Sequence, residues 1–154
     1  MNFVELQIAV ESEVLPSEQQ IQAWIDAALE EISQDTEIVI RVVDETEMAQ
    51  LNQQYRDKQG PTNILSFPFE APPGLPSMPI RLLGDLVICA LIVEREAKAQ
   101  KKSIEHHWAH IIVHGVLHLL GYDHIAEAEA DRMEAKEITI LKRFNINNPY
   151  IYEV

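Results

Sequence analysis

The sequence predicts one α+β domain over residues 1–154, in which helices pack on a small mixed sheet of about four strands. A chain of 154 residues can bury one core, and its 47% hydrophobic and 24% charged content is typical of a globular protein. Strand and helix periodicities follow one another in the order β-α-β-α-β-β-α-α-α. One helix in this order is apolar on most sides, which places it at the centre of the fold.

The N-terminal part of the chain predicts two strands separated by a helix. Residues 2–10 alternate apolar and polar side chains, and residues 37–43 are rich in β-branched side chains, so each range predicts a strand. Between them, Ser17 and Gln20 form a capping-box pattern that begins a helix. The apolar positions of that helix repeat every 3.6 residues: Ile21, Trp24, Ile25, Ala28, Leu29 and Ile32.

The middle of the chain predicts a short helix followed by two strands. Asp44 with Glu47 forms an N-cap pattern, and the helix that follows is expected to bury three side chains: Met48, Leu51 and Tyr55. Residues 62–69 are expected to be extended, and Pro68 favours a sheet edge because proline lacks the backbone N–H. A proline-rich loop then leads to a short apolar strand at residues 86–89.

The C-terminal half predicts three helices. The first is mostly polar and reaches about residue 102, where Ser103 is a candidate cap for the second. The second, residues 104–120, is the helix expected to be central and largely buried. The last is amphipathic and covers residues 127–144.

The most informative motif is His114-Gly-Val-Leu-His118-Leu-Leu-Gly121-Tyr-Asp-His124. Histidines four residues apart share one face of a helix, and a chain that turns at Gly121 could bring His124 back to the same ion. Three neutral nitrogen ligands suit Zn²⁺ and leave a fourth position open for water, as in catalytic sites. We predict one zinc ion per chain on His114, His118 and His124, at the C-terminal end of the central helix.

The residue between the first two ligands argues against a peptidase. Metzincin proteases read H-E-x-x-H-x-x-G-x-x-H and use the glutamate as general base, whereas this chain has Gly115 there. A different proton acceptor is therefore required. Among the other histidines, His106 and His107 are interpreted as capped, hydrogen-bonded or surface residues, and His110 either orients a ligand or packs.

The net charge and the amino-acid composition restrict which ligands and which cellular compartment we expect for this protein. A net charge of −13 opposes general binding of nucleic acid, so a polyanion would need a local basic patch. Candidates for that patch are Arg56 with Lys58, and a lysine group: Lys98, Lys101 and Lys102. The single cysteine, Cys89, excludes an internal disulfide and favours a reducing cytoplasm, and no apolar run is long enough to span a membrane.

Three segments together resemble the bacterial YbeY family, the metal-dependent endoribonucleases of ribosomal RNA maturation. One is the histidine motif; the others are Asn52-Gln-Gln-Tyr55-Arg56-Asp-Lys58-Gln-Gly-Pro61-Thr62-Asn-Ile-Leu65-Ser66-Phe67-Pro68 and Leu83-Gly84-Asp85-Leu-Val-Ile-Cys89. The resemblance covers essentially the whole chain in order and length. Asn63 stands where many members carry aspartate, and no role is assigned to it.

This resemblance implies a zincin-like α+β fold, zinc on the three histidines and cleavage of single-stranded RNA. It also implies a cytoplasmic enzyme that matures the 3′ end of 16S rRNA and serves ribosome quality control. The implied partners are single-stranded RNA, the small ribosomal subunit or its precursors, ribosomal proteins and an assembly GTPase, with no membrane and no DNA.

The resemblance also gives meaning to residues outside the histidine motif. Arg56 and His114 are the expected catalytic residues, since a guanidinium can clamp a phosphate and stabilise transition-state charge. The expected substrate contacts are Arg56, Lys58 and Ser66, and the candidates for orienting the ligands are Asp85, His110 and Asp123. The alternatives are a surface ion pair for Arg56, a solvated loop lysine for Lys58, and turn aspartates for Asp85 and Asp123.

Two other functions stay open at this level. One is a ribosome assembly factor whose zinc is structural, and the other is a metallohydrolase of another class, a peptidase or amidohydrolase. The nucleophile is also open, because either the 2′-OH of RNA or a water molecule could attack the phosphorus. A 2′,3′-cyclic phosphate product would exclude direct attack by water.

Overall fold

The computed structural model of the protein describes residues 1–12, 14–74, 78–122 and 126–150. Its elements follow the predicted order. The strands are β1 (Asn2–Ile8), β2 (Asp35–Val43), β3 (Ile64–Pro68) and β4 (Ile80–Cys89). The helices are α1 (Glu18–Ala28), α2 (Glu45–Arg56), α3 (Ala90–Ala99), α4 (Ile104–Leu119) and α5 (Glu127–Lys142). The predicted α+β class is therefore confirmed.

The strands form one mixed sheet in the order β1-β2-β4-β3. The first three strands in this order pair in parallel, and β3 runs antiparallel to β4 at the edge of the sheet. The edge position predicted from Pro68 is confirmed, and β3 ends at that residue. The prediction for residues 86–89 was too short, because β4 already begins at Ile80.

Gly84 explains why the sequence pattern understated β4. Its φ of +130° is a conformation that L side chains rarely adopt, and a Cβ there would lie 2.1 Å from the carbonyl oxygen of Phe67. The glycine thus allows β3 and β4 to approach closely at Pro68, its partner in the ladder. It also breaks the run of apolar residues from which a strand is predicted.

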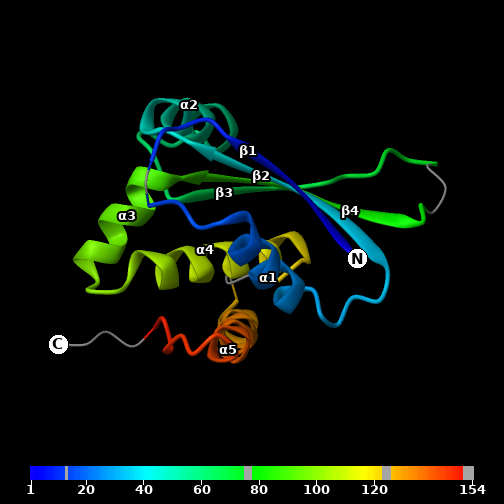
Figure 1. Cartoon of the computed structure of the whole chain (residues 1–154). Coiled ribbons are helices and arrows are strands. Elements are labelled where there is room, and N and C mark those ends of the chain that lie inside the picture. Colours follow the sequence, from blue (N-terminus) through cyan, green and yellow to red (C-terminus); the bar gives the residue numbers. More distant parts are fainter. Residues whose placement is uncertain (13, 75–77, 123–125, 151–154) are drawn as a thin grey trace.

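Helices cover the two faces of the sheet unequally (Figure 1). The helices α1 and α4 lie on one face, with α5 beyond them, and α2 lies on the other. The larger core lies on the α4 side and includes Ile38, Ile40, Leu86 and Ile88 from the sheet. The next residues along β4 turn to the α2 side, because successive side chains of a strand point to opposite faces: Val87 and Cys89.

The helix α4 is central and buried, as predicted. It contacts α1, α3, α5, β3 and β4, and most of its side chains are buried. Its N-cap is Ser103, whose hydroxyl accepts a hydrogen bond from the N–H of His106. The capping box of Ser17 and the N-cap of Asp44 are also present. None of the described helices is both long and apolar enough to cross a bilayer.

The predicted burial of Tyr55 was wrong. Its side chain is 59% exposed, although Met48 and Leu51 on the same helix do pack toward the sheet. Tyr55 lies in the last turn of α2 and meets the ring of Phe67 edge-on at 5.2 Å between centroids. The helical period alone places Tyr55 on the packed face, but at this end of α2 its ring meets the edge strand β3 at Phe67 and stays more than half exposed.

Candidate active site

A pocket of about 380 Å³ lies where the end of α2, the strand β3 and the helix α4 meet. Five residues named from the sequence line it: Arg56, Lys58, Ser66, His114 and His118. The remaining lining residues come from the same elements and the loop before β3: Asn52, Thr62, Asn63, Ile64 and Pro68. The structure therefore brings two cationic side chains, a hydroxyl and two imidazoles to one cavity.

The cationic side of the pocket is positioned by the end of α2. Arg56 is the last residue of this helix, and Asp57 ends it in a left-handed conformation with φ of 54°. The buried Asn52 donates from Nδ2 to the carbonyl oxygen of Gly60 at 2.8 Å. This hydrogen bond ties the loop that carries Lys58 back to the helix. Within the described residues, Arg56 makes no ion pair with a carboxylate, so the surface salt bridge considered from the sequence does not form there.

The register of β3 and β4 decides which strand residues can reach the pocket. Ser66 pairs with Leu86, which faces α4, so Ser66 lies on the side of the histidines. Asp85 pairs with Phe67 and shares the opposite face with Val87. Asp85 is exposed there, and partial desolvation of its carboxyl by neighbouring atoms, together with the charge of Glu5, raises the pKa of that carboxyl. The proposed orienting role of Asp85 therefore has no geometric support, because the sheet separates it from His114.

The imidazoles of His114 and His118 lie side by side on consecutive turns of α4. Their ring centroids are 4.7 Å apart and their planes are inclined by 80°. Both residues are partly buried and both line the pocket. The other residues predicted at this end of the site, Asp123 and His124, lie outside the described residues.

Gly115 lies between the two histidines and packs directly on the sheet. A Cβ at this position would lie 2.7 Å from Cδ1 of Ile64 and 2.9 Å from Cδ2 of Leu86. The backbone of α4 therefore approaches β3 and β4 too closely for a larger residue. A glutamate in this position would be forced into the core, which gives a structural reason for the absence of a protease-type base.

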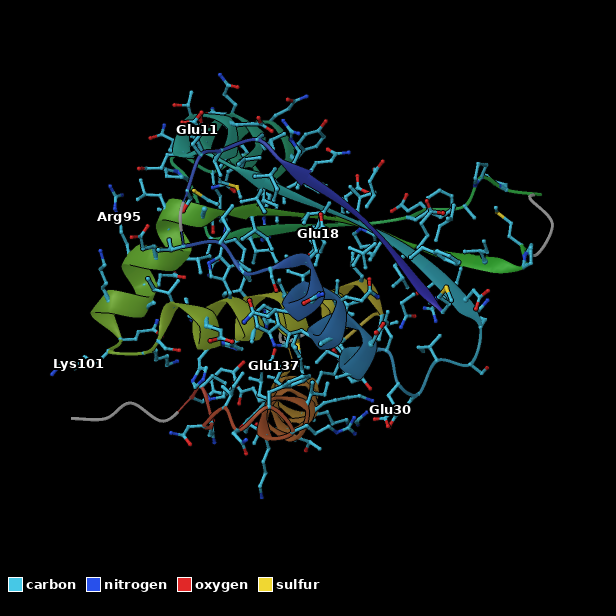
Figure 2. The ribbon with its side chains drawn as sticks, viewed as in Figure 1. Glu11, Glu18, Glu30, Arg95, Lys101 and Glu137 are labelled. Atoms are coloured by element: carbon cyan, nitrogen blue, oxygen red, sulfur yellow. The ribbon has the colours of Figure 1, made fainter. Side chains whose placement is uncertain are left out.

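Glu137 is a site residue that was not identified from the sequence. It lies on α5 with no exposed surface, and Figure 2 shows it between α5 and α4. Its Oε1 is 2.5 Å from Nδ1 of His114, and its Oε2 is 3.2 Å from Nε2 of His110. The hydroxyl of Tyr150 also donates to Oε2. Burial alone would raise the pKa of Glu137, but hydrogen bonds from His110, His114 and Tyr150 lower it to about 2.

A sequence signal for Glu137 did exist. The buried positions of α5 are Met133, Glu137, Ile140 and Leu141, which is a helical stripe with one carboxylate in it. A charged residue on an apolar stripe is rarely buried without a partner. The histidines were the available partners, but their contact with α5 depends on tertiary packing.

Two sets of metal ligands can be considered, one predicted from the sequence and one found among the described residues. In the first set, His114 and His118 face the pocket and the predicted third ligand is His124. In the second, ligand atoms of His110, His114 and Glu137 all lie within 4.8 Å of one another. Imidazole nitrogens and a carboxylate oxygen are suitable donors for Zn²⁺ and for several other divalent ions. The residues present therefore fit a divalent metal, with His114 common to both sets.

Two of the remaining histidines of α4, His107 and His110, are held by hydrogen bonds of their side chains. His107 is buried, and its Nε2 lies 3.0 Å from Oε1 of Glu96. Glu96 also accepts from Nδ2 of Asn63, a residue of the pocket lining, at 3.1 Å. His110 does not line this pocket; it contacts Glu137 and lies edge-on to the ring of His114, with the centroids 6.0 Å apart. The hydrogen-bonded interpretation of His107 thus agrees with the structure.

Comparison with known proteins adds three findings. A family model described as Endoribonuclease YbeY matches residues 7–145. Endoribonuclease YbeY of Colwellia psychrerythraea is 50% identical in an alignment that covers 97% of this chain and 97% of that protein. The solution structure of TM1509 from Thermotoga maritima matches with a TM-score of 0.61 and 22% identity, covering 94% of this chain and 92% of that one. The likeness to TM1509 shows a common fold.

Proposed function

The chain belongs to the endoribonuclease YbeY family, and we propose that it is itself a zinc-dependent endoribonuclease specific for single-stranded RNA. One observation carries the proposal: Arg56 and Lys58 line the same 380 Å³ pocket as His114 and His118. Cationic donors beside a pair of metal-ligand residues suit a phosphodiester, which needs charge stabilisation when it is attacked.

The charge of the protein restricts where RNA can bind. At a net charge of −13, most of the surface repels phosphate. Arg56 and Lys58 provide positive charge at the pocket itself. The walls are the edge strand β3 and the end of α2, and an unpaired strand can enter more easily than a rigid duplex. Single-stranded RNA is therefore the substrate class that we propose.

The five pocket residues named from the sequence have distinct parts in this proposal. The Arg56 guanidinium can hold two phosphate oxygens at once and stabilise the charge of the pentavalent transition state. Lys58 adds a point charge for the backbone, and the Ser66 hydroxyl can donate to a phosphate oxygen. Zinc held by His114, His118 and His124 would supply Lewis-acid chemistry to a phosphoryl oxygen or to water.

The zinc proteases do not indicate which group accepts the proton in this protein. Position 115, where those enzymes keep their base, is a glycine packed on Ile64 and Leu86. The 2′-OH of the RNA could be the nucleophile, or a water molecule could be. The chemistry of the products distinguishes these, because only 2′-OH attack leaves a 2′,3′-cyclic phosphate.

In the cell, we propose that the enzyme matures the 3′ end of 16S rRNA and takes part in ribosome quality control in the cytoplasm. The low intrinsic affinity expected of an acidic protein would be offset if a ribosomal particle presented the RNA. The partners proposed are the small subunit or its precursors, ribosomal proteins and an assembly GTPase. This extension rests on membership of the family.

The decisive experiment compares the wild type with His114→Ala and with His106→Ala, a matched histidine outside the pocket. Metal content would be measured together with cleavage of single-stranded RNA, double-stranded RNA, single-stranded DNA and peptides. We expect the wild type and His106→Ala to carry one zinc ion and to cleave only single-stranded RNA. His114→Ala should lose metal and activity. Hydrolysis of peptides would contradict the proposal and indicate a peptidase. Bound zinc without hydrolysis of any substrate would indicate an assembly factor with structural zinc.

A further inference from the structure

Glu137 is tied to the candidate site by contacts that no metal-ligand motif predicts. Its carboxylate is inaccessible to solvent and receives donors from α4 and from the C-terminal segment: His110, His114 and Tyr150. A buried carboxylate with this many partners has a fixed position. We propose that Glu137 is the positioning residue of His114, holding its ring with Nδ1 protonated and Nε2 directed to the pocket.

The protonation states follow from the partners. An ionised carboxylate can only accept hydrogen bonds, so the 2.5 Å contact requires that Nδ1 of His114 donate. The two ring nitrogens lie on different sides of the imidazole, so this contact turns Nε2 away from Glu137. Since His114 also lines the pocket, Nε2 is the nitrogen that can serve as a ligand there.

His110 and Tyr150 complete the arrangement by holding Glu137 in place. Nε2 of His110 lies 3.2 Å from Oε2 and donates to that ionised carboxylate. In a neutral ring that donates from Nε2, Nδ1 carries no proton, and Nδ1 of His110 is buried with no hydrogen-bond partner among the described residues. The ring of Tyr150 lies edge-on to His110 at 5.4 Å, so its hydroxyl reaches the same oxygen.

A direct metal ligand is the competing role for Glu137, since its carboxylate, His110 and His114 could also surround an ion. That role would require Nδ1 of His114 to be deprotonated, with Nε2 left for another use. The contacts to His110 and His114 have the lengths of hydrogen bonds between nitrogen and oxygen. With zinc bound, the two roles therefore predict different protonation of His114: Nδ1 keeps its proton if Glu137 positions the ring, and loses it if Glu137 and Nδ1 are themselves ligands.

The test uses the full chain, first metal-free and then saturated with zinc, and it does not require that the protein cleave RNA. Glu137→Gln keeps an acceptor oxygen but removes the charge, and Glu137→Ala removes both. Glu129→Gln changes an exposed carboxylate of the same helix and is the matched control. Long-range ¹⁵N–¹H NMR correlations would report the tautomer of His114 at alkaline pH, zinc titration would report affinity and stoichiometry, and thermal melting would report folding.

We expect a protonated Nδ1 in the wild type, in Glu129→Gln and in Glu137→Gln, and a loss of that preference in Glu137→Ala. Zinc affinity should fall about 10- to 100-fold in Glu137→Gln, with one ion still bound at saturation, and further in Glu137→Ala. If Glu137→Ala does not fold, the zinc affinity of Glu137→Gln alone tests the proposal. An unprotonated Nδ1 in the wild type, unchanged affinity in Glu137→Gln, or no zinc at saturation in that variant would overturn the proposal. These results are independent of RNA cleavage, so a failure of the nuclease proposal is seen separately.

Discussion

Nδ1 of His114 lies 2.5 Å from Oε1 of Glu137, although the two residues are 23 positions apart and belong to different helices. The contact joins the candidate site to α5, which contributes no residue to the pocket lining. One side of His114 is therefore set by a buried carboxylate, while the other faces the cationic end of α2. The activity of the pocket should depend on residues on both sides of α4.

Arg56 should be essential for cleavage and dispensable for folding. Arg56→Glu replaces the phosphate clamp by a repulsive charge and should abolish RNA cleavage, while metal content and thermal stability stay as in the wild type. Arg56→Lys keeps the charge but loses the bidentate geometry, and removing such a transition-state donor typically lowers kcat by about 10²- to 10³-fold. Single-turnover cleavage assays measure both effects.

The matched control for this experiment is Arg132→Glu, an equal charge change at an exposed residue of α5 outside the pocket. It should cleave RNA at close to the wild-type rate. Normal cleavage by Arg56→Glu would remove Arg56 from the mechanism, and equal losses in both variants would indicate a general effect of charge.

Substitutions of Ser66 and Asp85 test whether only the pocket-facing side of the sheet contributes to RNA cleavage. Ser66 lines the pocket and Asp85 lies on the opposite face, although they belong to neighbouring strands. Ser66→Ala should lower RNA affinity by roughly tenfold, because a hydrogen bond to a charged group is worth about 1.5 kcal/mol. Asp85→Ala should leave cleavage of free RNA unchanged. Measurements of KM and kcat for both variants would check this, and a larger loss in Asp85→Ala would contradict the assignment of faces.

Gly115→Ala should destabilise the protein, even though alanine favours helices by about 1 kcal/mol over glycine. The new Cβ would meet methyl groups of the partly buried Ile64 and the buried Leu86 at under 3 Å. Overpacking of a core costs about 1–3 kcal/mol, so we expect a net loss of up to about 2 kcal/mol in the free energy of unfolding in urea.

A double mutant identifies the clash as the cause. Ile64→Val removes Cδ1, the atom nearest to the new methyl group. By itself this change should cost about 0.5–1.5 kcal/mol, but it should cost less, or even stabilise, when Gly115→Ala is already present. Strict additivity of the two changes would show that Ile64 does not oppose a side chain at position 115.

Acid stability should depend on Glu96. Burial by itself would raise the pKa of this carboxyl, but hydrogen bonds from His107 and Asn63 lower it below the ordinary value of 4.5. A carboxyl with a depressed pKa in the folded state stabilises the protein above its unfolded pKa, and this contribution disappears as the pH falls through the folded pKa. Glu96→Gln should therefore weaken the loss of stability below about pH 4.5.

Urea unfolding at a series of pH values would measure this effect. Glu94→Gln is the control, because Glu94 lies on the same helix and its one ion pair within the described part of the chain is with the exposed Lys98, at 3.5 Å. That variant should show the wild-type dependence on pH. An identical dependence in wild type and Glu96→Gln would show that the network of Asn63, Glu96 and His107 does not contribute.

Features that depend on neighbouring residues in the chain could be predicted from the sequence. The caps at Ser17, Asp44 and Ser103 are bonds to backbone groups three residues away, and the structure confirms all three. The burial of α4 follows from apolar residues on most of its sides. The edge position of β3 follows from Pro68, because a missing N–H is tolerated there.

Features that depend on strand register and helix packing were decided only by the tertiary structure. Period-2 alternation tells which residues of a strand share a face, but the pairing with β3 was needed to place Ser66 at the pocket and Asp85 away from it. Tyr55 has the spacing of a core residue, yet it lies over the edge of the sheet. Glu137 stands on the buried stripe of α5, and only the packing of α5 on α4 shows which histidines it contacts.

The sequence by itself determined the histidine motif, the cationic residues Arg56 and Lys58, and the glycine that replaces a protease base. The tertiary structure decided that these cationic residues and two of the histidines meet at one pocket. It also decided that the buried carboxylate of Glu137 contacts Nδ1 of His114. The physical reason is the separation along the chain over which each kind of interaction acts. Caps and periodicities act over a few residues, whereas the site depends on contacts between α2, β3, α4 and α5 that form only when the core is packed.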